Sequence, residues 1–145
     1  MARIVETATG AVDTVVSVAP FVVTSSTAPP RTLLYQNYPN PFPRQGMPST
    51  TVVFDLAEAS RVSLSVYDLR GRLVRRLIPD AREGCSGGPL ELPAGSYGQN
   101  AGDPPCVTTK WDGDADGGDR MPAGIYLIRL TTGRESHTVR TLFRP

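Results

Sequence analysis

The chain contains 145 residues, carries a formal net charge of +1, and is 39% hydrophobic, with 14 Gly and 14 Pro. This length suits one domain with a buried core, and the near-neutral charge gives no reason to expect nucleic acid as a partner. The longest apolar run, residues 15–23, is broken by Ser17 and Pro20 and is too short for a transmembrane helix.

Residues 1–24 alternate weakly between apolar and polar, which predicts one extended strand. Residues 25–31 form a linker that Pro29 and Pro30 make semi-rigid. An isolated strand needs a partner for its backbone groups and its apolar face. Residues 1–24 could return to the edge of their own domain, be the remnant of a preceding domain, or add a strand to a neighbouring copy. We favour the neighbouring copy and take as candidate partner-binding residues Val12, Val16 and Val18.

The first half of the remaining chain is predicted to form short strands. Residues 33–43 mix aromatic residues with three Pro and suit an extended edge segment. Residues 50–56 and 61–67 both alternate, and a tight connection joins them, so we predict a hairpin. Residues 72–78 have apolar spacing that also suits a helix, but their shortness and the Gly and Pro at their ends favour a strand.

The second half centres on residues 107–130, which predict a strand, a turn-rich connection and a second strand that contains a near-continuous apolar run. Such a run is typical of a central strand covered on both faces. Residues 136–143 are expected to pair with it through a short turn. No helix is predicted, and the fold class is an all-β sandwich. Its expected core includes Val52, Phe54, Val62, Leu64, Val66, Leu73, Trp111, Ile125 and Leu127.

Two cysteines, Cys85 and Cys106, bracket a Gly- and Pro-rich segment without periodicity. We predict that they form a disulfide rather than two free thiols, which implies an oxidising compartment and an extracellular or cell-surface location. Two thiols and one distant His do not complete a zinc site.

Five short blocks of the sequence occur in an order found in a known family. The blocks are Asn37–Phe42 (NYPNPF), Ser49–Phe54 (STTVVF), Val66–Arg72 (VYDLRGR), Trp111–Gly113 (WDG) and Pro122–Tyr126 (PAGIY), and a last strand follows them. They resemble the C-terminal sorting domains of type IX secretion substrates and the related Ig-like domain of the flagellar hook-capping protein FlgD.

The resemblance implies an Ig-like antiparallel β-sandwich at the C-terminal end of a larger secreted protein, with an extended N-terminal strand segment added here. The domain would occupy residues 33–145, after a strand and linker over residues 1–32, and would contain a Cys-bounded insertion over residues 81–106. Its implied role is to direct passage across the outer membrane and attachment to the cell surface, with the secretion machinery as partner. The alternative is a structural subunit of an extracellular filament or surface assembly, joined to neighbouring copies through the N-terminal strand.

One candidate metal site remains in the connection after Trp111. Asp112, Asp114 and Asp116, followed by Gly117, match the first half of a calcium loop, but its closing Glu is replaced by Ala123. The resemblance implies a plain turn instead. The single His137 stands on a predicted strand with no nucleophile motif beside it. We therefore expect no catalytic residues, no enzyme activity and no cofactor other than this possible calcium ion.

Overall fold

The computed structural model describes residues 28–85, 87–99 and 102–145, and these residues are almost entirely β-structure or turns. A single 3-10 turn, η1 (Ala81–Glu83), is the one helical element among them. The strands are β1 (Leu33–Leu34), β2 (Thr50–Thr51), β3 (Phe54–Leu56), β4 (Ser60–Tyr67), β5 (Leu73–Ile78), β6 (Leu90–Leu92), β7 (Gly95–Tyr97), β8 (Lys110–Trp111), β9 (Gly124–Thr131) and β10 (Ser136–Phe143). The all-β fold class predicted from the sequence is confirmed. No helix in the described ranges could cross a membrane.

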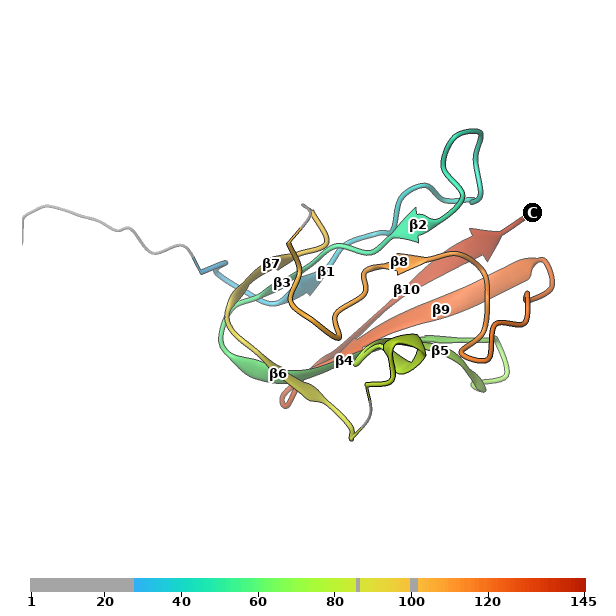
Figure 1. The fold of residues 1–145 in the computed structure, drawn as a ribbon. Helices are drawn as coiled ribbons and strands as arrows, with labels where there is room; N and C mark the ends of the chain where they lie inside the picture. Colours follow the sequence, from blue (N-terminus) through green and yellow to red (C-terminus); the bar gives the residue numbers. More distant parts are fainter. Residues whose placement is uncertain (1–27, 86, 100–101) are drawn as a thin grey trace, which may run out of the picture.

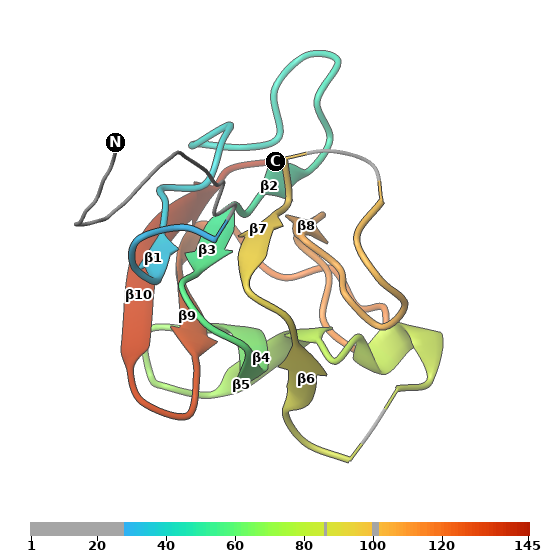
Figure 2. The same ribbon diagram turned by 90° about the vertical axis from the view of Figure 1, so that its left-hand side faces the viewer.

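The strands form two main antiparallel sheets on opposite sides of one core (Figures 1 and 2). The larger sheet has the order β10-β9-β4-β5, with β6 beside the start of β4, and the smaller sheet has the order β1-β3-β7. A short ladder of β2 and β8 pairs Thr50 with Trp111. The hairpin expected between β9 and β10 is present, with His137 opposite Leu130 and Phe143 opposite Gly124.

The hairpin predicted between residues 50–56 and 61–67 is wrong. β3 pairs with β1 and β7, whereas β4 pairs with β5, β6 and β9. The short connection over residues 57–59 therefore carries the chain from one sheet to the other. Alternation identifies a strand and its inner face, but it does not specify the neighbouring strand, because both sheets of a sandwich present the same pattern to the core.

The core contains most of the residues expected from the sequence, with two exceptions. Leu73 and Ile125 are each 41% exposed, so their assignment to the core is wrong, and Leu127 is half-buried. β9 is a central strand, but only the face of Tyr126, Ile128 and Leu130 is buried. The opposite face of β9, which carries Ile125, has no covering layer among the described strands. On β5, where the pairing with β4 contains register shifts, the buried residues are Val74, Leu77 and Ile78 instead of Leu73.

The segment between the cysteines is more regular than its composition indicates. β6 pairs with the start of β4 and β7 pairs with β3, so this stretch contributes a strand to each sheet. Cys85 and Cys106 are joined in a disulfide with their Cα atoms 5.9 Å apart. Val12, Val16 and Val18, the predicted partner-binding residues, lie outside the described residues.

Candidate functional site

The Asn37–Phe42 segment lies along the end of β10, the last strand of the chain. Phe42 N donates to Leu142 O at 3.0 Å, and Arg144 N donates back to Phe42 O at 2.8 Å, so the two segments run parallel. The side chain of Asn40 adds a contact, because its Oδ1 accepts from Leu142 N at 2.9 Å. The first motif block therefore fixes the position of the C-terminal strand.

Asn37 is a buried hydrogen-bond donor that joins three parts of the motif. Its Nδ2 donates to Thr50 Oγ1 at 2.8 Å and to Thr141 Oγ1 at 2.6 Å, and all three side chains are buried. Thr50 in turn donates to Pro39 O at 2.8 Å. A side-chain amide has two N–H groups, and both are used here. Sequence reasoning assigned Asn37 no role beyond membership of the block, because a buried amide cannot be recognised before its partners are known.

The only Trp of the chain is the centre of an aromatic cluster built from four separate segments. Trp111 is fully buried, with its ring centroid 5.3 Å from that of Phe42, 5.1 Å from that of Tyr126 and 5.9 Å from that of Phe143. Its Nε1 donates to Asp114 O at 2.8 Å, so the indole leaves no unpaired donor. Four of the five blocks that carry the family resemblance meet in this cluster and at Asn37.

Gly113 is required by the same packing. Its φ is +91°, and a Cβ atom at this position would lie 2.4 Å from the ring of Phe143. Both the left-handed backbone and the close ring exclude a larger residue. The Gly of the WDG block is thereby explained by the position of the last strand.

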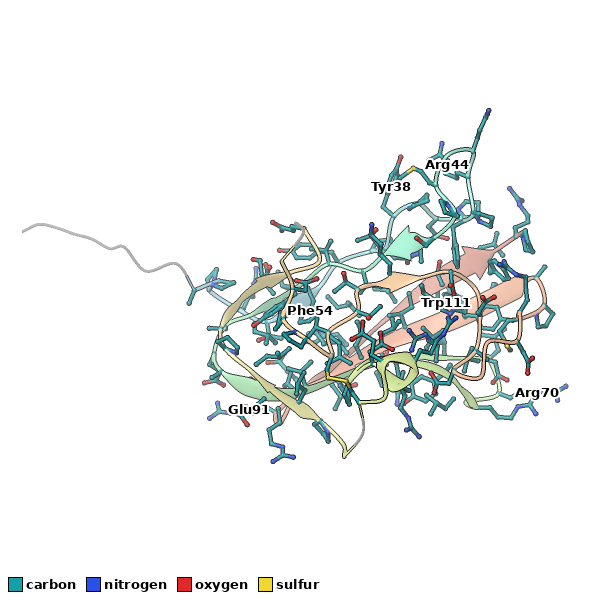
Figure 3. The ribbon with its side chains drawn as sticks, in the orientation of Figure 1. Tyr38, Arg44, Phe54, Arg70, Glu91 and Trp111 are labelled. Carbon is teal, nitrogen blue, oxygen red and sulfur yellow. A yellow bond between two sulfur atoms is a disulfide. The ribbon has the colours of Figure 1, made fainter. Side chains whose placement is uncertain are left out.

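Exposed apolar side chains occur on separate segments toward the end of the sandwich where β4 and β10 finish and β5 and β9 begin, which we call the C-terminal end. Figure 3 shows Tyr38 and Arg44 on a projecting segment near this end, and Arg70 in the turn between β4 and β5. Arg44 lies over the Tyr38 ring at 5.8 Å. Five of the six large apolar residues most exposed in the described chain lie here: Tyr38, Met47, Leu69, Leu73 and Ile125. Packing within the domain does not explain why these exposed positions carry large apolar side chains.

The three aspartates of the candidate calcium loop each lie beside a different arginine. The pairs are Asp112 Oδ2 with Arg82 Nη1 at 3.5 Å, Asp114 Oδ1 with Arg120 Nε at 3.4 Å and Asp116 Oδ1 with Arg75 Nη1 at 3.4 Å. Within the described ranges, no three His, Cys, Asp or Glu side chains come together as a metal site. A cation would have to displace these contacts. Calcium binding here stays a prediction, which a calorimetric titration with millimolar calcium tests.

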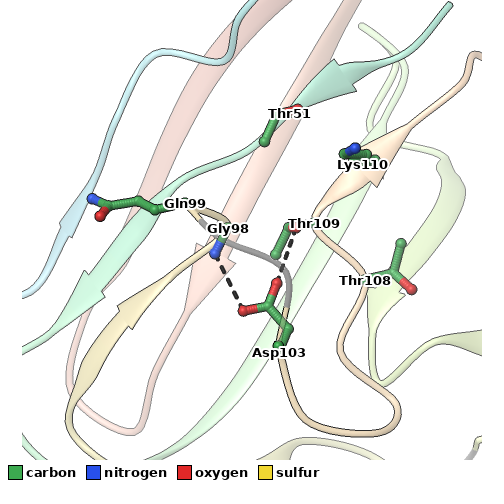
Figure 4. Close-up of a pocket in the computed structure, with 8 residues that line it drawn as sticks. Thr51, Gly98, Gln99, Asp103, Thr108, Thr109 and Lys110 are labelled. Carbon is green, nitrogen blue, oxygen red and sulfur yellow. Dashed lines mark hydrogen bonds between the residues drawn. The ribbon is translucent and has the colours of Figure 1, made fainter.

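A groove of about 490 Å³ lies between the end of β7 and the approach to β8 (Figure 4). Its carboxylate, Asp103, accepts from Gly98 N at 3.3 Å and from Thr109 Oγ1 at 3.2 Å, so both oxygens hold the loop in place. None of its described lining residues is Ser, Cys or His. His137 lies elsewhere, on β10, where its Nε2 is 2.7 Å from Glu135 Oε1.

Comparison with known proteins gives matches to solved structures alone. No family model matches, and no curated protein matches. PorZ, described as an essential surface component of the type-IX secretion system of Porphyromonas gingivalis, shares 20% identity at a TM-score of 0.44 over 77% of this chain and 11% of its own. Dimeric latent PorU from the same organism shares 21% sequence identity at a TM-score of 0.48, over 85% of this chain and 10% of its own. FlgD from P. aeruginosa shares 22% identity at a TM-score of 0.42, over 82% of this chain and 75% of its own. The chain thus spans about a tenth of the length of PorZ and of PorU.

Proposed function

We propose that this chain is a non-catalytic secretion and surface-attachment module, which export machinery recognises at its C-terminal end. The observation that carries the proposal is that the five motif blocks contain both buried residues that hold the fold and exposed residues that do not. Asn37, Phe42 and Trp111 are buried and hold the last strand in place. Tyr38 and Leu69 belong to the same blocks, yet they are 60% and 63% exposed. Residues that packing does not need are available for recognition.

The disulfide between Cys85 and Cys106 supports an extracellular or surface location, because such bonds persist mainly in oxidising compartments. The anchored end of β10 supports the proposed recognition site. Arg144, the residue after β10, is hydrogen-bonded to Phe42, so the end of β10 is held against the first motif block.

A reporter fusion tests the proposal. The reporter would carry an export signal at its N-terminus and this chain at its C-terminus, in a bacterium that has a type IX system. Labelling of intact cells with an antibody against the reporter measures surface display. We expect display with the chain and none with the reporter alone. A folded fusion that stays inside the cell would count against the proposal.

A second candidate function is a structural subunit joined to its neighbours through residues 1–24. It is favoured by the position of β10 at the edge of its sheet. Backbone groups of Arg140 and Leu142 point away from β9, so by alternation those of Thr138 do as well. No described residue bonds to Thr138 on that side, so its backbone groups could pair with a further strand by β-augmentation, although β1 lies close to β10 there (Figure 2). Deleting residues 1–24 and measuring mass in solution decides this point, since an unchanged oligomeric state rejects strand exchange.

A further inference from the structure

The outer face of the larger sheet carries a row of apolar side chains that crosses four strands. Leu142 on β10 is opposite Ile125 on β9, and Leu127 on β9 is opposite Tyr67 on β4. Tyr67 is in turn opposite Leu73 on β5. Ile125 and Leu73 are each 41% exposed, and the other three are half-buried. The solvent face of an antiparallel sheet is normally polar, so a continuous apolar row indicates a contact surface.

Arginines border this row, and no outward-facing acidic residue lies on β4, β5, β9 or β10. The exposed Glu91 lies on β6, opposite Arg61, away from the row. Arg140 is opposite Leu127, Arg129 lies 5.4 Å from the centre of the Tyr67 ring, and Arg76 is opposite Ser65. In the described residues, no carboxylate forms an ion pair with any of these three arginines. The face is therefore locally basic although the whole chain has a net charge of only +1.

Next to the row, the face is hollowed into a groove of about 200 Å³ over β4 and β5. Ser63, Ser65 and Arg76 are among the residues that line it. Cys85 and Pro89 line it as well, so the disulfide-bonded segment borders the groove. An extended chain fits better into such a groove, which has an apolar row at one end and an arginine in its lining, than onto a flat surface.

We propose that this outer face binds an extended segment of a partner protein whose apolar side chains alternate with carboxylates. In an extended strand, successive side chains point to opposite sides and residues two apart share a side, so Leu-like residues can contact the apolar row while neighbouring carboxylates reach arginines at its border. A second copy of this chain is a poorer occupant, because its own outer face carries the same positive charges. This inference extends the proposed secretion function by naming the chemistry of a partner, and its test does not depend on export.

The test uses the full chain and a short synthetic peptide that alternates Leu and Glu. Binding is measured by calorimetry, and the contact surface by amide chemical shifts. Two control peptides replace Glu with Lys or Leu with Ser. We expect the Leu/Glu peptide to bind best and to shift amides of β4, β5, β9 and β10. Because the proposed binding uses both the apolar row and the arginines at its border, each control peptide should bind at least about tenfold more weakly, equivalent to about 1.4 kcal/mol.

Variants at exposed positions make the assignment specific. Ile125→Ser and the pair Arg129→Gln, Arg140→Gln should each weaken binding by about tenfold. The matched control is Arg134→Gln, an exposed arginine outside this face whose side chain pairs with Glu58 at 3.4 Å. Unchanged melting temperatures show that the variants are folded. Equal binding of the Leu/Lys peptide, or full binding by both variants, would overturn the proposal.

Two further measurements exclude other occupants. Vesicles of phosphatidylcholine with phosphatidylserine test for an anionic membrane, and binding to them with no binding of the Leu/Glu peptide would overturn the proposal. Sedimentation of the chain alone tests for binding of a second copy. Self-association that Ile125→Ser abolishes would also overturn the proposal. The expected result is a chain that neither binds the vesicles nor self-associates through this face.

Discussion

Arg75 and Asp80 form an ion pair, with Nη1 and Oδ1 2.9 Å apart, in which the side chains are only 6% and 4% exposed. Arg75 lies on β5, within the larger sheet, and Asp80 begins the turn that leads to Cys85. Asp80 also accepts hydrogen bonds from Thr108 Oγ1 and from Arg82 N, and its own N–H donates to Cys106 O at 2.9 Å. The ion pair therefore links the sheet to both ends of the disulfide-bonded segment.

Removing one partner of this pair should be costly. Asp80→Ala leaves a buried guanidinium with only the more distant Asp116, at 3.4 Å, and should lower the free energy of unfolding by about 3 kcal/mol. The control is the double variant Arg75→Met, Asp80→Leu, which leaves no buried charge unpaired and should be clearly more stable than Asp80→Ala. Urea denaturation measures both. Equal midpoints for wild type and Asp80→Ala would show that the pair does not stabilise the fold.

Acid should weaken the fold through the same carboxylate. Burial alone would raise the pKa of Asp80, but hydrogen bonds from Arg75, Thr108 and the Arg82 amide, together with the charge of Arg75, outweigh it and lower the pKa. A lowered pKa in the folded state contributes stability above the ordinary unfolded value of about 4, and this contribution is lost as the pH falls through the lower folded value. The free energy of unfolding should therefore fall below about pH 4, less steeply in Asp80→Asn. Identical pH profiles for the two proteins would contradict this.

Gly113 provides a direct test of the packing around the last strand. Gly113→Ala places a methyl group 2.4 Å from the Phe143 ring, at a φ of +91°, and should destabilise the fold by about 3 kcal/mol. Gly71→Ala is the matched control, because φ is +85° there and nothing lies within 4 Å of the added Cβ. It should cost only about 1 kcal/mol, the backbone contribution alone. Thermal or urea unfolding compares the two variants. Equal losses of unfolding free energy would mean that the Phe143 ring moves aside at no cost.

The disulfide should stabilise the domain and the groove on the outer face. Non-reducing mass spectrometry should find Cys85 and Cys106 linked, and two alkylatable thiols in the native protein would contradict this. The double variant Cys85→Ser, Cys106→Ser frees a loop with a sequence separation of 21 and should lower stability by about 3 kcal/mol. A variant as stable as wild type would mean that the ion pair of Arg75 and Asp80 holds this segment without the bond.

The sequence predicted the strands better than it predicted their neighbours. Alternation located β4 and β10, and shortness with flanking Gly and Pro correctly favoured a strand for β5. It did not show that β3 and β4 belong to different sheets, because pairing depends on contacts distant in sequence. β6 and β7 were missed for a similar reason. Their Gly- and Pro-rich segment has weak strand propensity of its own. β6 and β7 form strands because they pair with β4 and β3, which are distant in sequence.

The candidate site was predictable only as a set of blocks. Trp111 was expected in the core, but the contacts of Asn37 with Thr50 and Thr141 depend on three distant segments meeting. Likewise, the spacing of Asp112, Asp114 and Asp116 indicates a cation loop only while their arginine partners are unknown. A linear pattern identifies chemical groups, whereas the fold decides which charges face one another.

The measurement that tests the central proposal most directly is surface display of a reporter fused to the double variant Tyr38→Ser, Leu69→Ser, compared with a fusion to Tyr35→Ser. Tyr38 and Tyr35 are both exposed tyrosines on neighbouring stretches of chain, at 60% and 42%, but only Tyr38 belongs to a motif block at the C-terminal end. Because recognition is proposed to use the exposed motif residues, Tyr38→Ser combined with Leu69→Ser should reduce display severalfold while the melting temperature stays near that of wild type. Tyr35→Ser should be displayed normally. Equal display of all these folded fusions would contradict the account.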